Sequence, residues 1–121
     1  MNVIIAGGRD FNDYELLKRK LNHLLGRWLH LPVQIDVVSG CAWGADRLGE
    51  RWAKEVGAYV VPFPADWEKY GKAAGPIRNE EMAKYAAGEY CVCFWDGKSK
   101  GTKDMISLCQ KYDINLRVVR Y

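Results

Sequence analysis

The sequence has few cysteines and histidines, and neither kind is arranged to bind a metal ion. The cysteines include no C-x-x-C pair, and both histidines, His23 and His30, fall in one expected helix away from them. This spacing excludes the common structural zinc sites, so we expect no metal ion and no cofactor. We expect all four cysteines to stay reduced and three of them to be small core residues, namely Cys91, Cys93 and Cys109, with Cys41 apart.

Long apolar runs and a strong charge of one sign are also lacking. No run approaches the roughly 20 residues that a membrane span needs, and the start of the chain lacks a signal-peptide layout. We therefore expect a cytoplasmic protein with no membrane partner. The net charge of +3 fits an anionic small-molecule ligand and is too weak to favour nucleic acid.

Two common nucleotide-binding signatures are missing as well. The letters G-K-S occur at Gly97 to Ser99, but Val92 stands where the phosphate loop of NTPases needs its first glycine. The first glycine turn lacks G-x-G-x-x-G, and the second expected strand is followed by Ser39 instead of an acidic residue that could hold a ribose. These absences exclude phosphate-loop NTPases and classical dinucleotide-dependent dehydrogenases.

The chain does contain a regular alternation of apolar strands and amphipathic helices. The strand patterns are continuous runs instead of alternating ones, which indicates a parallel sheet with helices on both faces. Right-handed crossovers then give a doubly wound α/β domain over residues 1–121 with strand order 3-2-1-4-5. Expected strands are 2–6, 33–38, 58–62, 89–95 and 115–119; expected helices are 13–30, 45–56, 77–87 and 103–112. The long connection 63–75 is expected to be a functional lid.

Three glycine-containing turns should meet at the carboxyl edge of this sheet. Glycine lets backbone N–H groups approach a phosphate closely, and a helix that begins directly afterwards adds its positive end. Any one glycine could instead merely permit a tight turn. The candidate ligand-binding residues on these turns are Gly7, Gly8, Arg9, Asp10, Ser39, Gly40, Gly44, Asp46, Asp96, Ser99, Lys100, Gly101 and Thr102.

Charged and aromatic residues near this edge suggest how a nucleotide would be held. Arg78 lies in the first turn of the helix behind the lid and could clamp a phosphate through two hydrogen bonds. We expect Lys98 to be a solvated surface residue. The aromatic residues could either stack on a base or close the crevice from above: they are Trp43, Trp67, Tyr70 and Trp95.

Four segments in order resemble the YspA-type, YpsA-related branch of the SLOG superfamily. They are Gly7 to Phe11, Ser39 to Asp46, Asp66 to Asn79 and Asp96 to Thr102, and the resemblance covers nearly the whole chain. The superfamily includes the Smf/DprA DNA-processing proteins and the "Lonely guy" phosphoribohydrolases. The resemblance implies a Rossmann-like fold and a nucleotide or nucleotide-derived ligand.

The "Lonely guy" enzymes suggest site residues to compare. Their R-K-x-x-M pattern is similar to Arg78, Asn79 and Met82, with asparagine in place of lysine, so the resemblance implies a catalytic arginine and a binding role for Asn79. Their P-G-G-x-G-T-x-x-E pattern is matched at Gly101-Thr102, but Met105 stands where the glutamate should be. Asp104 is the nearest catalytic substitute, although it should point about 100° away around the helix.

The leading hypothesis is that the protein binds a nucleotide, NAD or an ADP-ribose-like ligand. In one form of this hypothesis the protein acts as a sensor of that ligand. The enzymatic alternative is a nucleotide N-glycoside or phosphoribosyl hydrolase that uses Asp10, Asp46, Asp96 or Asp104 as its acid. A third hypothesis, taken from the DNA-processing relatives, is single-stranded nucleic-acid binding, against which the weak net charge counts. Relatives commonly pair through helices, so a homodimer is an expectation from the resemblance.

Overall fold

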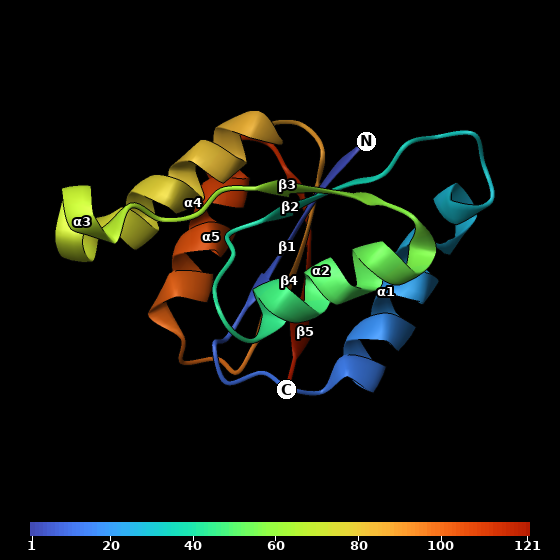
Figure 1. Ribbon diagram of the computed structural model, residues 1–121, viewed down its shortest axis with the longest axis horizontal. Coiled ribbons are helices and arrows are strands. Elements are labelled where there is room, and N and C mark those ends of the chain that lie inside the picture. Colours follow the sequence, from blue (N-terminus) through green and yellow to red (C-terminus); the bar gives the residue numbers. More distant parts are fainter.

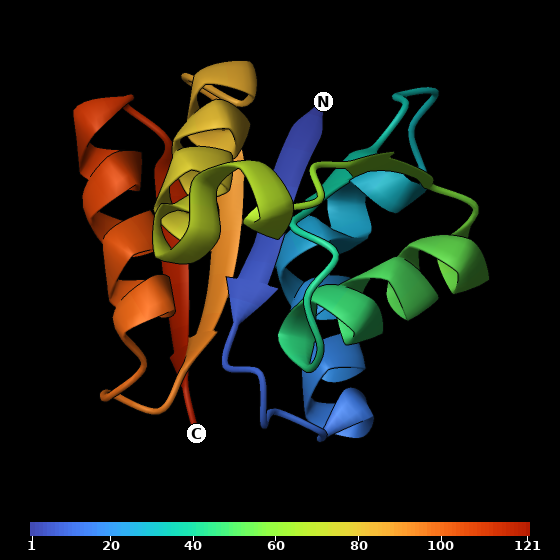
Figure 2. The same ribbon diagram turned by 60° about the vertical axis from the view of Figure 1, so that its left-hand side comes forward.

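The computed structural model, which describes residues 1–121, contains one five-stranded parallel sheet. Its spatial order is β3-β2-β1-β4-β5, as the sequence pattern predicts, and every neighbouring pair is parallel. All the carboxyl ends of the strands therefore lie at one edge of the sheet (Figure 2). The strands are β1 (Asn2–Gly7), β2 (Asp36–Ser39), β3 (Tyr59–Pro62), β4 (Tyr90–Trp95) and β5 (Asn115–Arg120).

The helices form one layer on each face of the sheet. Figure 1 shows α1 and α2 on one side and α4 and α5 on the other, with the sheet seen between them. None of these helices combines the length and the apolar character needed to cross a membrane. The helices are α1 (Tyr14–Leu29), α2 (Ala45–Val56), α3 (Trp67–Tyr70), α4 (Ala74–Tyr85) and α5 (Lys100–Lys111), with the 3-10 turn η1 (Gly71–Ala73) between α3 and α4.

Two helices begin three residues earlier than the sequence pattern predicts. Helix α5 begins at Lys100 because the Ser99 hydroxyl accepts a hydrogen bond from the Thr102 N–H, so Gly101 lies inside the first turn. Helix α4 continues directly from η1 at Ala74, and Pro76 is tolerated because the first turn needs no N–H partner at that position. The expected lid is thus shorter and partly helical.

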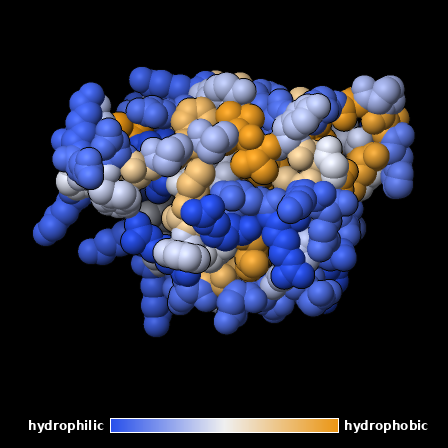
Figure 3. All heavy atoms as spheres, viewed as in Figure 1, coloured by the Kyte–Doolittle hydropathy of each residue, from blue (hydrophilic) through white to orange (hydrophobic).

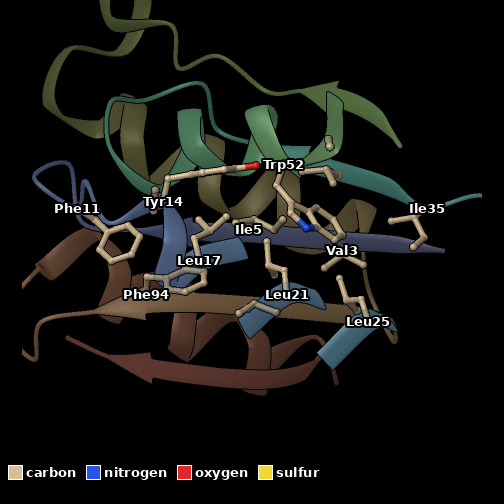
Figure 4. Close-up of a cluster of buried hydrophobic side chains, with 14 residues drawn as sticks. Val3, Ile5, Phe11, Tyr14, Leu17, Leu21, Leu25, Ile35, Trp52 and Phe94 are labelled. Atoms are coloured by element: carbon tan, nitrogen blue, oxygen red, sulfur yellow. The ribbon is translucent and has the colours of Figure 1, made fainter. Parts of the chain in front are cut away.

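Two apolar clusters, one on each face of the sheet, hold the layers together. The larger cluster packs α1 and α2 against β1, β2 and β4, and Figure 4 shows its side chains meeting between these elements. Trp52 is fully buried there, and its indole N–H donates to Asn22 Oδ1 over 2.9 Å. The smaller cluster packs α4 and α5 on the opposite face and contains the predicted core cysteines Cys91, Cys93 and Cys109.

The edge of the sheet formed by β3 is open to solvent. Tyr59 and Val60 are exposed on this strand, and so are Leu31 and Val33 in the connection after α1. Figure 3 shows hydrophobic residues gathered over these two segments. The expected strand 33–38 begins only at Asp36, which is the first residue of this segment in register with both β1 and β3.

The turns after β1 and β2 are packed against each other with no room for a side chain. The Ala45 N–H donates to the Gly8 carbonyl over 3.2 Å. Gly44 has φ +79°, and a Cβ there would lie 2.2 Å from the Gly8 carbonyl oxygen. Only glycine fits this position, both for its backbone conformation and for the close approach.

We predict that Gly44→Ala lowers the free energy of unfolding by about 3 kcal/mol, because backbone strain adds to the collision with the neighbouring turn. Gly57→Ala is the matched control, since Gly57 has φ +77° but open space around it. It should cost only about 1 kcal/mol. Urea unfolding of both variants measures the difference, and equal losses would show that the contact between the turns contributes no stability.

Candidate functional site

A cavity of about 500 Å³ lies at the carboxyl edge, between the ends of β1, β2 and β4 and the first turns of α4 and α5. Its position is the point where the strand order reverses, which is where doubly wound sheets bind ligands. The cavity brings together most of the predicted site residues. They are Gly7, Gly8, Arg9, Asp10, Gly40, Asp46, Arg78, Asn79, Ser99, Lys100, Gly101, Thr102 and Asp104.

Three predicted ligand residues do not line the cavity, and each shapes a neighbouring turn. The Ser39 hydroxyl is fully buried and donates to Glu50 Oε2 over 2.6 Å. Gly44 packs against the first turn, as described above. Asp96 accepts the N–H groups of Lys98 and Ser99, each over 2.8 Å, and thereby shapes the turn before α5.

The cavity also contains residues that the sequence pattern did not single out for binding. Because helix α4 was expected to begin later, its first turn was assigned to the lid and was not expected to line the cavity. Of the aromatic candidates, only Trp67 reaches this cavity, and Trp95 instead donates its indole N–H to the Ser99 carbonyl over 3.1 Å. The additional lining residues are Ala6, Ala42, Gly75, Pro76, Met82 and Met105.

Arg78 projects from the second turn of α4 toward the turn after β2. Its guanidinium donates from Nη1 to the Gly40 carbonyl and from Nε to Asn79 Oδ1, the latter over 3.0 Å. A Cβ on Gly40 would lie 2.8 Å from Arg78 Nη1, so this glycine makes room for the arginine. Burial lowers the pKa of Arg78, while nearby Asp46 raises it, and an arginine remains cationic in either case.

Asp46 is a nearly buried carboxylate at the start of α2. Its Oδ2 accepts the Ala42 N–H over 3.1 Å, which holds the turn in place. Burial raises the pKa of Asp46 to about 6, against the opposing effects of the Ala42 N–H and the Arg78 charge. The cavity therefore contains an acidic group that changes protonation state close to neutral pH.

A second carboxylate faces the cavity from α5. Asp104 Oδ2 accepts a hydrogen bond from Asn79 Nδ2 over 3.0 Å, and the same amide nitrogen lies 3.4 Å from the Gly101 carbonyl oxygen. Sequence reasoning placed Asp104 about 100° away from the position equivalent to the "Lonely guy" glutamate. Both Asp104 and the buried Met105 border the cavity, because α5 enters it near its first turns.

The first turn of α5 supplies donors for an anion. The hydroxyls of Ser99 and Thr102 lie 3.0 Å apart, and the Thr102 N–H donates to Ser99 Oγ over 3.3 Å. Helix geometry leaves the N–H groups of Lys100 and Gly101 without acceptors inside the helix. Together with the positive end of the helix dipole, these groups can hold a phosphate or a carboxylate.

The cavity rim formed by the turn after β1 is held in place by the C-terminal residue, Tyr121. The Tyr121 hydroxyl donates to Asp10 Oδ1 over 3.0 Å, and its ring packs on Phe11. Burial and the Asp10 carboxylate raise the pKa of Tyr121 to about 12. A Cβ on Gly8 would lie 2.1 Å from this hydroxyl, so the glycine is required for the contact.

The raised pKa of Asp46 predicts a specific pH dependence of stability. The pKa is about 6 in the folded protein and 3.8 ordinarily, so the folded state retains its proton longer than the unfolded state does. As the pH rises from about 4 to about 6, the ionisation of Asp46 should therefore lower the free energy of unfolding progressively, by about 2 to 3 kcal/mol in total.

The test compares the wild type with Asp46→Asn, which keeps an oxygen acceptor for the Ala42 N–H. The stability advantage of the variant should grow across that pH range and stay constant above about pH 7. Urea unfolding at intervals of half a pH unit measures it. Parallel stability profiles for the two proteins would show that Asp46 titrates normally in the folded state.

Comparisons with known proteins identify a family for the chain. A family model described as "YspA, cpYpsA-related SLOG family" matches residues 1–70, which include the turns after β1 and β2. The chain is 38% identical over 117 residues to the "Gene 61 protein" of Mycobacterium phage D29, covering 93% of this chain and 90% of that protein. No solved structure matches the chain significantly. The chain belongs to the YspA, cpYpsA-related SLOG family.

Proposed function

We propose that the protein binds a nucleotide or a nucleotide-derived ligand, such as an ADP-ribose or NAD-like molecule, in the cavity at the carboxyl edge. One observation carries the proposal. A single cavity joins a partly buried arginine, Arg78, to glycine turns at Gly7-Gly8, Gly40 and Gly101. Family membership supports a nucleotide-related ligand in general terms.

The phosphate would lie between Arg78 and the first turn of α5. Arg78 uses Nε and Nη1 within the protein, so its Nη2 group and the second N–H of Nη1 remain for the ligand. Lys100 and Gly101 line the other side of the cavity, and helix geometry leaves their N–H groups available to the ligand. A charged donor combined with backbone donors is the usual way in which proteins hold phosphate.

The carboxylates fit the sugar of such a ligand. Asp10 and Asp104 each have one oxygen in a hydrogen bond within the protein and a second oxygen without a side-chain donor. Carboxylate oxygens accept hydrogen bonds from ribose hydroxyls, as they do in other dinucleotide sites.

We predict that Arg78→Ala weakens the binding of AMP or ADP-ribose by about 10- to 100-fold, because it removes a hydrogen bond between charged groups. Arg78→Lys should recover only part of the affinity, since lysine lacks the planar pair of donors. Calorimetric titration with AMP, ADP-ribose and NAD measures the affinities. Arg51→Gln is the matched control, because Arg51 lies on α2 over the Tyr14 ring and outside the cavity.

The proposal fails if none of these ligands binds the wild type or raises its melting temperature. It also fails if Arg78→Ala and Arg51→Gln change the affinities equally. Urea unfolding of each variant separates a loss of binding from a loss of folding, because the Arg78 contact with the Gly40 carbonyl also stabilises the turn.

The second candidate function is hydrolysis of a nucleotide N-glycosidic bond, favoured by the carboxylates of Asp46 and Asp104 in one cavity. Asp46, with a pKa of about 6, could take a proton from water, whose oxygen forms a bond to C1′ of the ribose. The bond between C1′ and the base breaks, the electron pair leaves with the base, and the proton that Asp46 took from the water is passed to the released base. Asp104 lies where it can bind the sugar hydroxyls or the attacking water.

If the protein is a hydrolase of this kind, it should release free base from nucleoside monophosphates, with a rate that rises as the pH passes through about 6. Asp46 acts as a base only when it is deprotonated, and removing a general base typically costs about 100-fold or more in rate. Chromatography of the products from wild type, Asp46→Asn and Asp104→Asn measures this. The absence of release from any nucleotide that binds would leave binding alone as the function.

A further inference from the structure

A second cavity of about 430 Å³ adjoins the first across the turn after β2. The two cavities share the backbone of Gly40 and Ala42 and the side chains of Arg9, Trp67 and Arg78. The second cavity continues toward the start of α2 and the segment after β3. Its own lining residues are Cys41, Trp43, Arg47, Pro64 and Ala65.

The charges in the two cavities differ sharply. The first contains the carboxylates of Asp10, Asp46 and Asp104, whereas no acidic side chain lines the second. Its charged groups are Arg9, Arg47 and Arg78. Arg47 has an ion pair with Glu50 over 3.3 Å, but the arginine side chain is half exposed, and such surface pairs hold a side chain weakly. The second cavity is therefore suited to negative charge.

Two tryptophans border this cavity with their rings in solvent. Trp43 is 77% exposed and Trp67 is 49% exposed, so neither contributes much to the core. The Arg47 guanidinium lies 5.9 Å from the Trp43 ring centre, and that of Arg9 lies 5.6 Å from the Trp67 ring centre. Exposed indoles next to arginines form a surface on which a planar aromatic ring can stack.

The backbone between the two cavities is held in an unusual conformation. Cys41 has φ +62°, which residues other than glycine rarely adopt, and its N–H donates to the buried Ser39 hydroxyl over 3.1 Å. Such strain persists only where the surroundings impose it, and it occurs mostly at functional sites. Here it turns the chain between Gly40, which meets Arg78, and Trp43, which meets Arg47.

We infer that the second cavity binds the distal part of an elongated ligand, namely a further phosphate and a second aromatic ring, so that the ligand class is a dinucleotide. The inference rests on the proposed function, because the first nucleotide occupies the first cavity. Arg78 and Arg9 belong to both cavities and meet the phosphates that join the two halves. Trp43 and Trp67 stack on the second ring.

A dinucleotide fits these walls better than a nucleic-acid strand does. A strand needs a continuous basic track along its phosphates, which gives the binding a steep dependence on salt. In this site the arginines are grouped in the second cavity and at its junction with the first, and the carboxylates of the first cavity would repel phosphates that continued beyond that junction. The net charge of +3 adds little general attraction for a polyanion.

The test compares AMP, ADP-ribose and NAD as probes by calorimetric titration. The wild type should bind NAD at least tenfold more tightly than AMP, with ADP-ribose between them, because each added group reaches further into the second cavity. Arg47→Gln and Trp43→Ala should each reduce that advantage about fivefold or more and leave the AMP affinity unchanged. Trp43→Phe should restore most of it, since it keeps a stacking ring.

Arg51→Gln is again the matched control, since it removes an arginine from the same helix outside both cavities. Equal affinities for NAD and AMP would overturn the inference and leave the proposed function standing, as long as AMP binding depends on Arg78. Equal losses of AMP and NAD affinity in Arg47→Gln would overturn it as well. Binding of none of the probes would overturn both proposals. If an oligonucleotide bound more tightly than NAD and with a strong dependence on salt, the ligand would be a nucleic-acid strand and the dinucleotide inference would be overturned.

Discussion

The close packing of the turn after β2 on the turn after β1 is the constraint on which the rest of the site depends. The Ala45 N–H reaches the Gly8 carbonyl only because Gly44 has no side chain between them. This contact fixes where α2 begins, and therefore where Asp46 and Arg47 project. One backbone contact thus sets the positions of an acidic side chain, Asp46, in the first cavity and a basic side chain, Arg47, in the second.

A balance of charge follows from that placement. Arg78 and Asp46 approach the same face of Gly40, where a Cβ would lie 2.8 Å from Arg78 Nη1 and 2.9 Å from Asp46 Oδ2. Each is partly removed from water, and each opposes the pKa shift that burial causes in the other. Burial has the larger effect on Asp46, so its pKa is raised in spite of the arginine. At mildly acidic pH Asp46 is consequently only partly ionised, so it does not fully neutralise the charge of Arg78. That residual positive charge suits an anionic ligand.

The fold was predictable from the sequence because its signals are local and repeated. Continuous apolar strands, separated by amphipathic helices, allow few topologies once crossovers must be right-handed. The strand order then brings the turns after β1, β2 and β4 to one edge without further information. For this reason most of the glycines and charged residues of the first cavity could be named from the sequence.

The remaining parts of the site depend on contacts that sequence patterns do not contain. Glycines at Gly75 and Gly101 indicated turns, yet both lie in the first turns of helices, so the part of the cavity wall formed by the first turn of α4 was missed. Ser39 looked like a ligand residue, but its hydroxyl is directed to Glu50 inside the protein. The second cavity was not foreseen, because it requires the segment after β3 to fold back beside α2.

The contact between Tyr121 and Asp10 joins residues 111 positions apart in the chain. It connects the loop that borders the cavity to the end of β5, an edge strand that pairs only with β4. Edge strands are the first to open when a sheet fluctuates, so each opening of β5 would also release Asp10 from its partner. The order of the cavity rim at Asp10 and the attachment of the outermost strand are therefore coupled through one hydrogen bond.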